Sequence, residues 1–170
     1  MKFSVAPHDT IIWIATIVVV LVPIFIGWLV VFFTRERPKF QRTLWKLFAV
    51  LFAIVPNLII LCYAPLRYEL RENYLLIKQV KKERRIPFDK IRKVERIKDL
   101  GSTIRTGGIG GVFGFTGNYS SSKIGPFKGY ITNQSKLVLI ETTEGKYVIS
   151  PAEPEKFIRI LRKFVNKNQN

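Results

Sequence analysis

The chain has 170 residues, with 28 Lys and Arg, 12 Asp and Glu, and a formal net charge of +16. Its single cysteine and single histidine exclude an internal disulfide and any zinc site built from several cysteines. The charge is uneven, because residues 65–170 hold 22 basic and 10 acidic residues (22 − 10 = +12), whereas residues 11–33 and 47–64 hold no charged side chain.

The first apolar segment, residues 11–33, follows an N-terminal tail at residues 1–10. Its 23 residues would form a helix about 35 Å long, enough to cross a hydrocarbon core of about 30 Å. A cleaved signal peptide is the alternative, but the apolar segment is longer than usual for one and no small-x-small site follows it. We therefore expect a first transmembrane helix.

The second apolar segment, residues 44–64, is expected to be a second transmembrane helix. The short basic loop 34–46 between the two segments predicts an antiparallel hairpin. This loop has five Lys and Arg, while the N-terminal tail and the 20 residues after the second segment together have seven. The positive-inside rule therefore leaves the orientation open.

After residue 65 the apolar period changes to two, which is typical of half-buried strands. About seven strands are expected, with turns at Glu72-Asn73 and Glu144-Gly145. Their approximate ranges are 66–71, 74–80, 82–86, 91–97, 128–132, 136–142 and 146–150.

The last element is predicted to be an amphipathic helix. Ser150 is the expected N-cap, with Pro151 at the first helical position and Glu153 completing a capping box. An apolar stripe follows at helical spacing, formed by Phe157, Ile160, Leu161 and Phe164. This stripe should pack on the strands, and residues 166–170 should form a disordered tail.

The soluble part resembles the bacterial PH domain families, in particular membrane proteins that carry a PH domain. The residues that carry the resemblance are Ile86-Pro87-Phe88-Asp89-Lys90-Ile91, the glycine-rich stretch that ends near Tyr119, Gly129-Tyr130-Ile131-Thr132, and Tyr147-Val148-Ile149-Ser150-Pro151 with Pro154 and Phe157. The resemblance implies a mainly-β PH-like barrel over residues 66–165, capped by the C-terminal helix. It implies no substrate and no catalytic residue.

The glycine-rich stretch 107–117 has glycines at every third position from Gly108 to Gly117. It lacks the Gly-Lys-Ser/Thr of a P-loop and the last glycine of a dinucleotide motif, which argues against nucleotide binding. We expect an apolar loop, and two interpretations stay open. Phe113 and Phe115 either enter the membrane interface or complete the core while the glycines permit tight bends.

Ten basic residues lie within positions 78–98. The expected contacts for anionic lipid headgroups or for a membrane partner are Lys78, Lys81, Lys82, Arg84, Arg85, Arg92 and Lys93. A solvated basic face is the alternative. Binding to nucleic acid also fits the charge, but no reading helix or stacking motif accompanies it, so we do not expect it.

Catalysis has little support in the sequence. Asp89, Glu95 and Asp99 are surrounded by Lys and Arg, which predicts charge pairing and not an acid/base pair. We therefore expect a two-pass protein of the cell membrane whose PH-like domain binds lipid headgroups or a membrane partner, with no cofactor or metal. Family analogy and attraction to anionic lipid place this domain in the cytoplasm. An accessory or scaffold subunit of a larger membrane complex is the alternative, and the oligomeric state is not predicted.

Overall fold

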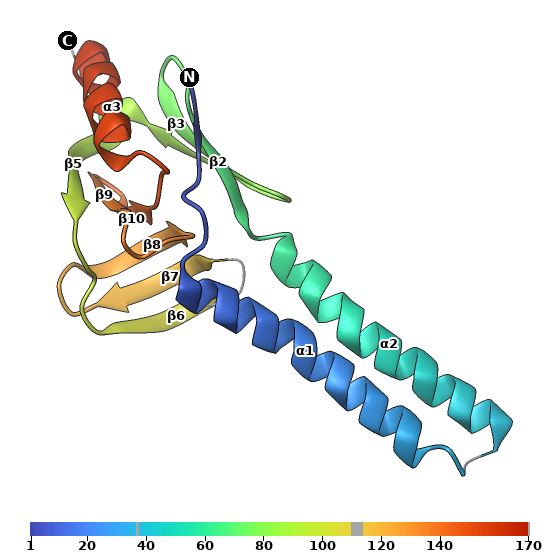
Figure 1. The fold of residues 1–170 in the computed structure, drawn as a ribbon. Coiled ribbons are helices and arrows are strands. Elements are labelled where there is room, and N and C mark those ends of the chain that lie inside the picture. The colour runs from blue at the N-terminus through green and yellow to red at the C-terminus, as the bar shows by residue number, and fades with distance from the viewer. Residues whose placement is uncertain (37, 110–113, 170) are drawn as a thin grey trace.

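The computed structural model describes residues 1–36, 38–109 and 114–169. Two long helices form an antiparallel pair that projects from a β domain (Figure 1). The helices are α1 (Thr10–Phe33) and α2 (Lys39–Leu61), so the second helix begins earlier than expected and includes most of the predicted basic loop. A methyl group added at Gly27 would lie 3.6 Å from the Cβ of Ala49, so small residues allow the two helices to approach closely there.

The strands form two separate sheets and not the closed barrel that we expected. The first sheet has the order β1-β2-β3-β4, and its strands are β1 (Lys2–Ser4), β2 (Pro65–Leu70), β3 (Tyr74–Gln79) and β4 (Glu83–Pro87). The second sheet has the order β5-β9-β10-β8-β7-β6. Its strands are β5 (Ile91–Ile97), β6 (Thr103–Ile109), β7 (Phe115–Ser121), β8 (Gly125–Ile131), β9 (Leu137–Thr142) and β10 (Gly145–Ile149).

The break between the sheets lies at the 3-10 turn η1 (Phe88–Lys90). Pro87 has no N–H to continue a ladder, and the chain turns after it, so β5 pairs with β9 and not with β4. Phe88 is fully buried, and its ring lies 5.8 Å from that of Phe164 in the C-terminal helix. The turn thereby closes one edge of the core between the two sheets.

The seven predicted strands are all present, but β1, β6 and β7 were not predicted. Strands β6 and β7 pair antiparallel across the glycine-rich stretch, which we expected to be an apolar loop, and β6 begins before that stretch, at Thr103. Gly108 and Gly117 face each other across this hairpin, and a Cβ at Gly117 would lie only 2.3 Å from the carbonyl oxygen of Gly107. The glycines therefore permit a strand pairing that side chains would block, and their low β-propensity hides these strands in the sequence.

Helix α3 (Pro154–Gln169) covers the open side of the main core. Its apolar stripe, including Phe157 and Leu161, is buried against both sheets, as predicted. Two details of the prediction were wrong. The helix begins at Pro154, because the Ser150 side chain accepts a hydrogen bond from the Thr132 amide (2.7 Å) and does not cap the helix. It also continues to Gln169, so residues 166–169 are helical and not a disordered tail.

Residues 1–9 are an integral part of the β domain, whereas we expected residues 1–10 to be an N-terminal tail. Strand β1 pairs with β2, and the Phe3 ring packs edge-on against Phe157 at 5.1 Å. Ala6 is completely buried, and its amide donates to the Ser150 carbonyl at 2.8 Å. The Thr132 hydroxyl donates to the Ala6 carbonyl at 2.7 Å. The chain therefore passes through the domain before it enters α1.

Asp9 connects this segment to α1. Its Oδ1 atom accepts from the Ile12 amide (3.0 Å) as an N-cap, and its Oδ2 atom accepts from the Gln134 amide (2.9 Å) after β8. One carboxylate thus fixes both the first turn of α1 and the end of the second sheet.

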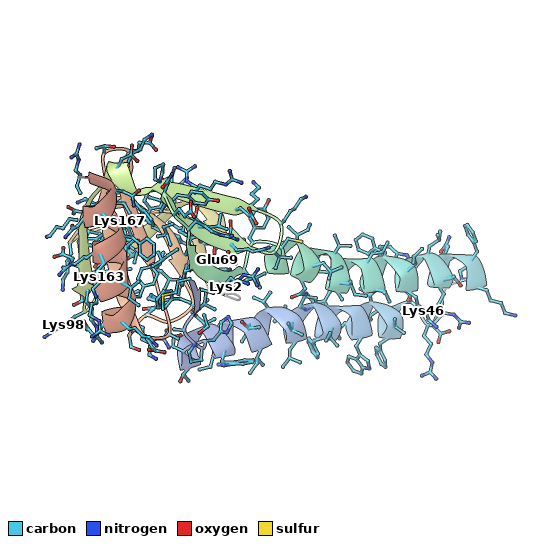
Figure 2. The ribbon with its side chains drawn as sticks, turned by 90° about the horizontal axis from the view of Figure 1, so that it is seen from above. Lys2, Lys46, Glu69, Lys98, Lys163 and Lys167 are labelled. Carbon is cyan, nitrogen blue, oxygen red and sulfur yellow. The ribbon has the colours of Figure 1, made fainter. Side chains whose placement is uncertain are left out.

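Strand β2 carries a buried carboxylate, Glu69, whose side chain is 2% exposed. Arg67 and Arg71 each place a guanidinium nitrogen 2.6 Å from one of its oxygens. Burial by itself would raise the pKa of Glu69, but the hydrogen bonds from Arg71 and Arg67 outweigh this effect and lower the pKa below its usual value. Glu69 lies opposite Lys2 in the pairing of β1 with β2 (Figure 2). The ion pairs of Glu69 with Arg67 and Arg71 therefore support β2, the strand on which the N-terminal strand pairs.

We predict that Thr132→Val loosens the N-terminal segment. The variant leaves the buried Ala6 carbonyl without its hydroxyl donor, which costs about 1–3 kcal/mol. Hydrogen exchange of residues 1–9 in the full chain should therefore become faster. Thr142→Val is the matched control, because it removes a similar bond to Gly145 in an exposed turn. Unchanged exchange of residues 1–9 in Thr132→Val would contradict the role given to this bond.

We also predict that Glu69→Gln weakens the dependence of stability on acid. The folded-state pKa of Glu69 lies below the unfolded value, which is about 4.3. The stability that the carboxylate contributes is therefore complete above that value and is lost as the pH falls through the folded pKa. Thermal unfolding between pH 7 and pH 3 should show a lower Tm for the variant at pH 7 and a smaller decrease on acidification. Parallel Tm curves for the two proteins would exclude this contribution.

Candidate functional site

The turn between β3 and β4 is attached to the C-terminal end of α2. The Lys81 amide donates to the Cys62 carbonyl at 3.0 Å, and the Gln79 side-chain amide donates to the Tyr63 carbonyl at 2.6 Å. The backbone N–H of Gln79 donates to the Lys82 carbonyl at 2.9 Å, which closes the turn. Two of these bonds use the carbonyls of Cys62 and Tyr63, which directly follow Leu61, the last residue of α2. The turn therefore has a fixed position beside the last residues of α2.

This turn displays both cations and apolar surface. Lys81 and Lys82 are exposed, and the Lys82 ammonium lies 5.4 Å from the centre of the Tyr63 ring, within range of a cation–π contact. Val80 and Leu66 beside them are each 48% exposed. We refer to Leu66, Val80, Lys81 and Lys82 as the helix-end patch.

The other predicted basic residues do not join this patch as one surface. Lys78 lies 3.6 Å from Glu83 across the β3–β4 pair, and Arg85 lies over the Tyr74 ring at 5.5 Å. Arg92 and Lys93 are on β5 in the second sheet, where Lys93 pairs with Glu95 at 2.8 Å. The sequence places these residues close together, but the alternation of side chains and the break at η1 separate them.

Arg84 has a different environment from its neighbours, because it points from β4 toward the second sheet. Its Nη2 atom donates to the Tyr147 hydroxyl at 2.7 Å, and Lys128 also lies over the Tyr147 ring, at 6.0 Å. The hydrogen bond to Tyr147 raises the pKa of the Arg84 guanidinium, which therefore stays charged. Arg84 thus links the two sheets.

Phe115 lies at the start of β7 and is half-buried. Its ring is 6.3 Å from that of Tyr119, and it packs against a second apolar cluster that includes Phe127 and Ile131. This placement favours the interpretation in which Phe115 completes a core. Phe113, the other predicted contact of this stretch, lies outside the described residues, so its role stays a prediction.

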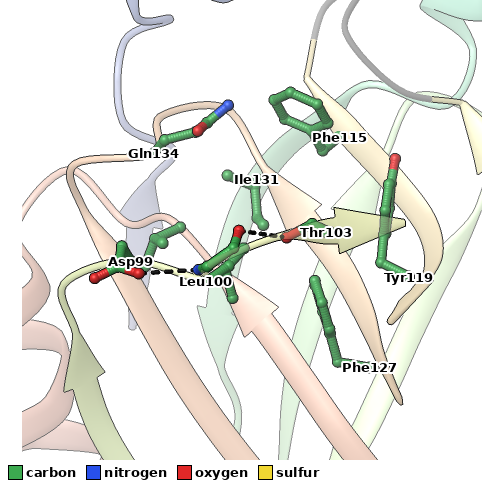
Figure 3. Close-up of a pocket in the computed structure, with 10 residues that line it drawn as sticks. Asp99, Leu100, Thr103, Phe115, Tyr119, Phe127, Ile131 and Gln134 are labelled. Atoms are coloured by element: carbon green, nitrogen blue, oxygen red, sulfur yellow. Dashed lines mark hydrogen bonds between the residues drawn. The ribbon is translucent and has the colours of Figure 1, made fainter. Parts of the chain in front are cut away.

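A cavity of about 230 Å³ lies next to this cluster, and sequence reasoning did not detect it (Figure 3). It is lined by Asp99, Leu100, Gly101, Thr103, Phe115, Tyr119, Phe127, Ile131, Gln134 and Leu137. Most of these side chains are apolar. They come from four separate strands and two connections, which is why no local pattern marks the cavity.

Within residues 1–36, 38–109 and 114–169, no group of three or more His, Cys, Asp or Glu could hold a metal ion. The carboxylates that we expected to form charge pairs largely do so. Glu95 contacts Lys93, and Asp99 contacts Lys123 at 2.5 Å. The hydrogen bond from Lys123 lowers the pKa of Asp99, so this group is ionised at neutral pH.

A family model described as Bacterial PH domain matches residues 66–165. The chain belongs to the bacterial PH domain family. The match covers β2 through most of α3, including the whole second sheet and the helix-end patch. Helices α1 and α2 and strand β1 lie outside the matched range. Neither the search of curated proteins nor the search of solved structures found a match.

The bacterial PH domain is in general a binding module, and its parts here are consistent with that role. The described residues combine a rigid two-sheet scaffold, a positively charged patch attached to α2, and an apolar cavity. These parts allow the domain to bind another molecule at a defined surface.

Proposed function

We propose that the protein is a membrane-anchored binding module whose helix-end patch contacts the anionic headgroups of lipids. The observation that carries this proposal is the attachment of the β3–β4 turn to Cys62 and Tyr63 at the end of α2. If α2 crosses the bilayer, its end lies at the headgroup level. The attached lysines then lie at the same level.

The composition of the helices supports the first part of the proposal. Ile12–Phe33 and Lys39–Ile59 are each long and apolar enough to cross a membrane. Only 6% of each apolar window is buried within the protein. In water these helices would expose a continuous apolar surface far larger than soluble monomers tolerate. A bilayer would cover this surface.

The connection to the domain gives the two helices a common direction. Helix α1 begins and α2 ends at the β domain, while Lys46 and the connection between the helices lie at the far end (Figure 2). A bilayer around the helices would place the domain and the helix connection on opposite sides. We propose the cytoplasmic side for the domain, because anionic lipids give that leaflet a negative surface potential. Labelling of cysteines introduced at Lys39 and Lys163 with an impermeant reagent would determine the side.

The composition of the patch supports contact with headgroups. Each basic residue near an anionic surface contributes about 1 kcal/mol of attraction. Val80 and Leu66 supply apolar surface beside the lysines, as expected for residues at an interface. Attachment to the bilayer also keeps the local lipid concentration high, so weak contacts are occupied.

A second candidate function is that of an accessory subunit in a larger membrane complex. Strand β6 is the last strand of its sheet, and Ile104 on it is 71% exposed. A partner could add a strand to this edge and cover Ile104. Purification of a stoichiometric partner in mild detergent, lost on Ile104→Lys, would favour this function over lipid binding.

The main proposal predicts that Val80 lies within reach of lipid headgroups. A fluorophore at Val80→Cys, in a Cys62→Ser background, should be quenched by headgroup-labelled lipid in nanodiscs. A fluorophore at Lys163→Cys on α3 should not be quenched, because α3 lies far from the helices (Figure 2). Quenching at position 80 should increase with the fraction of anionic lipid.

Reversal of the two patch charges, Lys81→Glu with Lys82→Glu, should abolish this dependence on anionic lipid, since it removes at least about 2 kcal/mol of attraction. Arg92→Glu with Lys93→Glu is the matched control on β5 and makes the same change in net charge. Equal effects of the two double variants, or equal quenching at positions 80 and 163, would refute the proposal.

A further inference from the structure

The cavity described above lies on the side of the second sheet that faces away from the main core. Val138 and Ile140 of β9 belong to the core between the sheets, whereas Leu137 and Leu139 belong to the second cluster. The connection from β5 to β6, which carries Leu100, closes over this second cluster. The cavity is the unfilled part of that enclosure, with Phe127, Ile131 and Tyr119 converging on it (Figure 3).

One end of the cavity lies where α1 begins. Gln134 lines the cavity, and its backbone N–H donates to the side chain of Asp9, the residue that caps α1. Phe115, another lining residue, pairs with Ile131 at the same end of β8. Under the proposed membrane placement, this end of the cavity therefore faces the bilayer surface.

The chemistry of the lining selects for an uncharged ligand. No Lys, Arg or His is among the described residues that line the cavity. Asp99 is the one charged residue among them, and it is occupied by Lys123 and by the Gly101 amide (2.9 Å). Nothing in the lining can neutralise a phosphate or a carboxylate. Besides Asp99, the polar side chains of the lining are those of Thr103, Gln134 and Tyr119, and the remaining side chains are apolar.

The size of the cavity fits a short length of hydrocarbon. An apolar cavity of about 150 Å³ is known to stay dry and to admit benzene. The volume here, about 230 Å³, is larger but below the range of drug-sized sites, which begins at about 300 Å³. A flexible alkyl chain can fill such an irregular space and pack against Phe115, Phe127 and Ile131.

We propose that this cavity takes the end of one alkyl chain of a bilayer lipid. The inference rests on the proposed membrane placement, which brings the bilayer surface to the end of the cavity that lies beside α1. The headgroup of that lipid stays at the bilayer surface, in the region of the helix-end patch. The domain thus contacts two parts of the lipid layer. Lys81 and Lys82 contact the charged headgroups, and the cavity holds the end of an alkyl chain.

The test uses the full chain in nanodiscs that contain a phospholipid with a diazirine near the end of one acyl chain. After illumination, mass spectrometry locates the adducts by peptide. We expect adducts on α1 and α2 and also on peptides that contain Phe115, Phe127 or Ile131. Thr103→Trp adds a large side chain to the lining of the cavity and should abolish the adducts in the domain while those on the helices remain. Ser102→Trp is the matched control, because Ser102 precedes Thr103 but does not line the cavity.

The helix adducts separate the two proposals. Labelled helices without labelled β7 or β8 would overturn the cavity assignment and leave the membrane anchor intact. Absence of label from the helices as well would overturn both. Domain labelling by a free diazirine fatty acid, but not by the phospholipid, would overturn the bilayer as the source of the chain. The melting temperatures of Thr103→Trp and Ser102→Trp must be equal. Loss of labelling in Thr103→Trp then cannot result from unfolding of the domain.

Discussion

The arrangement of the whole molecule depends on the way residues 1–9 are built into the β domain before the chain enters α1. Met1 pairs with Leu70 at the start of this segment, and Asp9 holds the Gln134 amide at its end. Each hydrogen bond contributes only about 1 kcal/mol, but the segment is held along its length by a strand pairing, a buried alanine and a capping carboxylate. A helix that is joined to a domain only at its tip could pivot, and α1 is joined over nine residues.

Helix α2 is restrained at the same end by different contacts. It continues into β2 after a short connection, and the β3–β4 turn holds Cys62 and Tyr63. Two independent attachments fix the direction of the helix pair relative to both sheets. A bilayer that surrounds the pair would therefore meet a defined face of the domain. The helix-end patch and the end of the cavity beside α1 both lie toward this face, which is why we interpret them together.

Much of this fold could be predicted from local patterns. The apolar segments gave both helices, period-two alternation gave seven strands, and the stripe from Phe157 to Phe164 gave α3. Features that depend on distant partners could not be predicted. Ser150 resembles an N-cap in sequence, but its hydroxyl accepts a hydrogen bond from the amide of Thr132, which directly follows β8. Lys81 belongs to the candidate site because of its contact with Cys62, and the cavity arises only where several strands and connections meet.

The central claim, that the helix pair and the domain form one rigid unit, can be tested by a distance measurement. Spin labels would be placed at Ile17 on the exposed face of α1 and at Arg159 on the exposed face of α3, in a Cys62→Ser background in nanodiscs. Pulsed dipolar spectroscopy should give a single narrow distance distribution. A broad distribution would show that the domain moves freely on its helices, and that result would contradict the fixed placement of both binding surfaces.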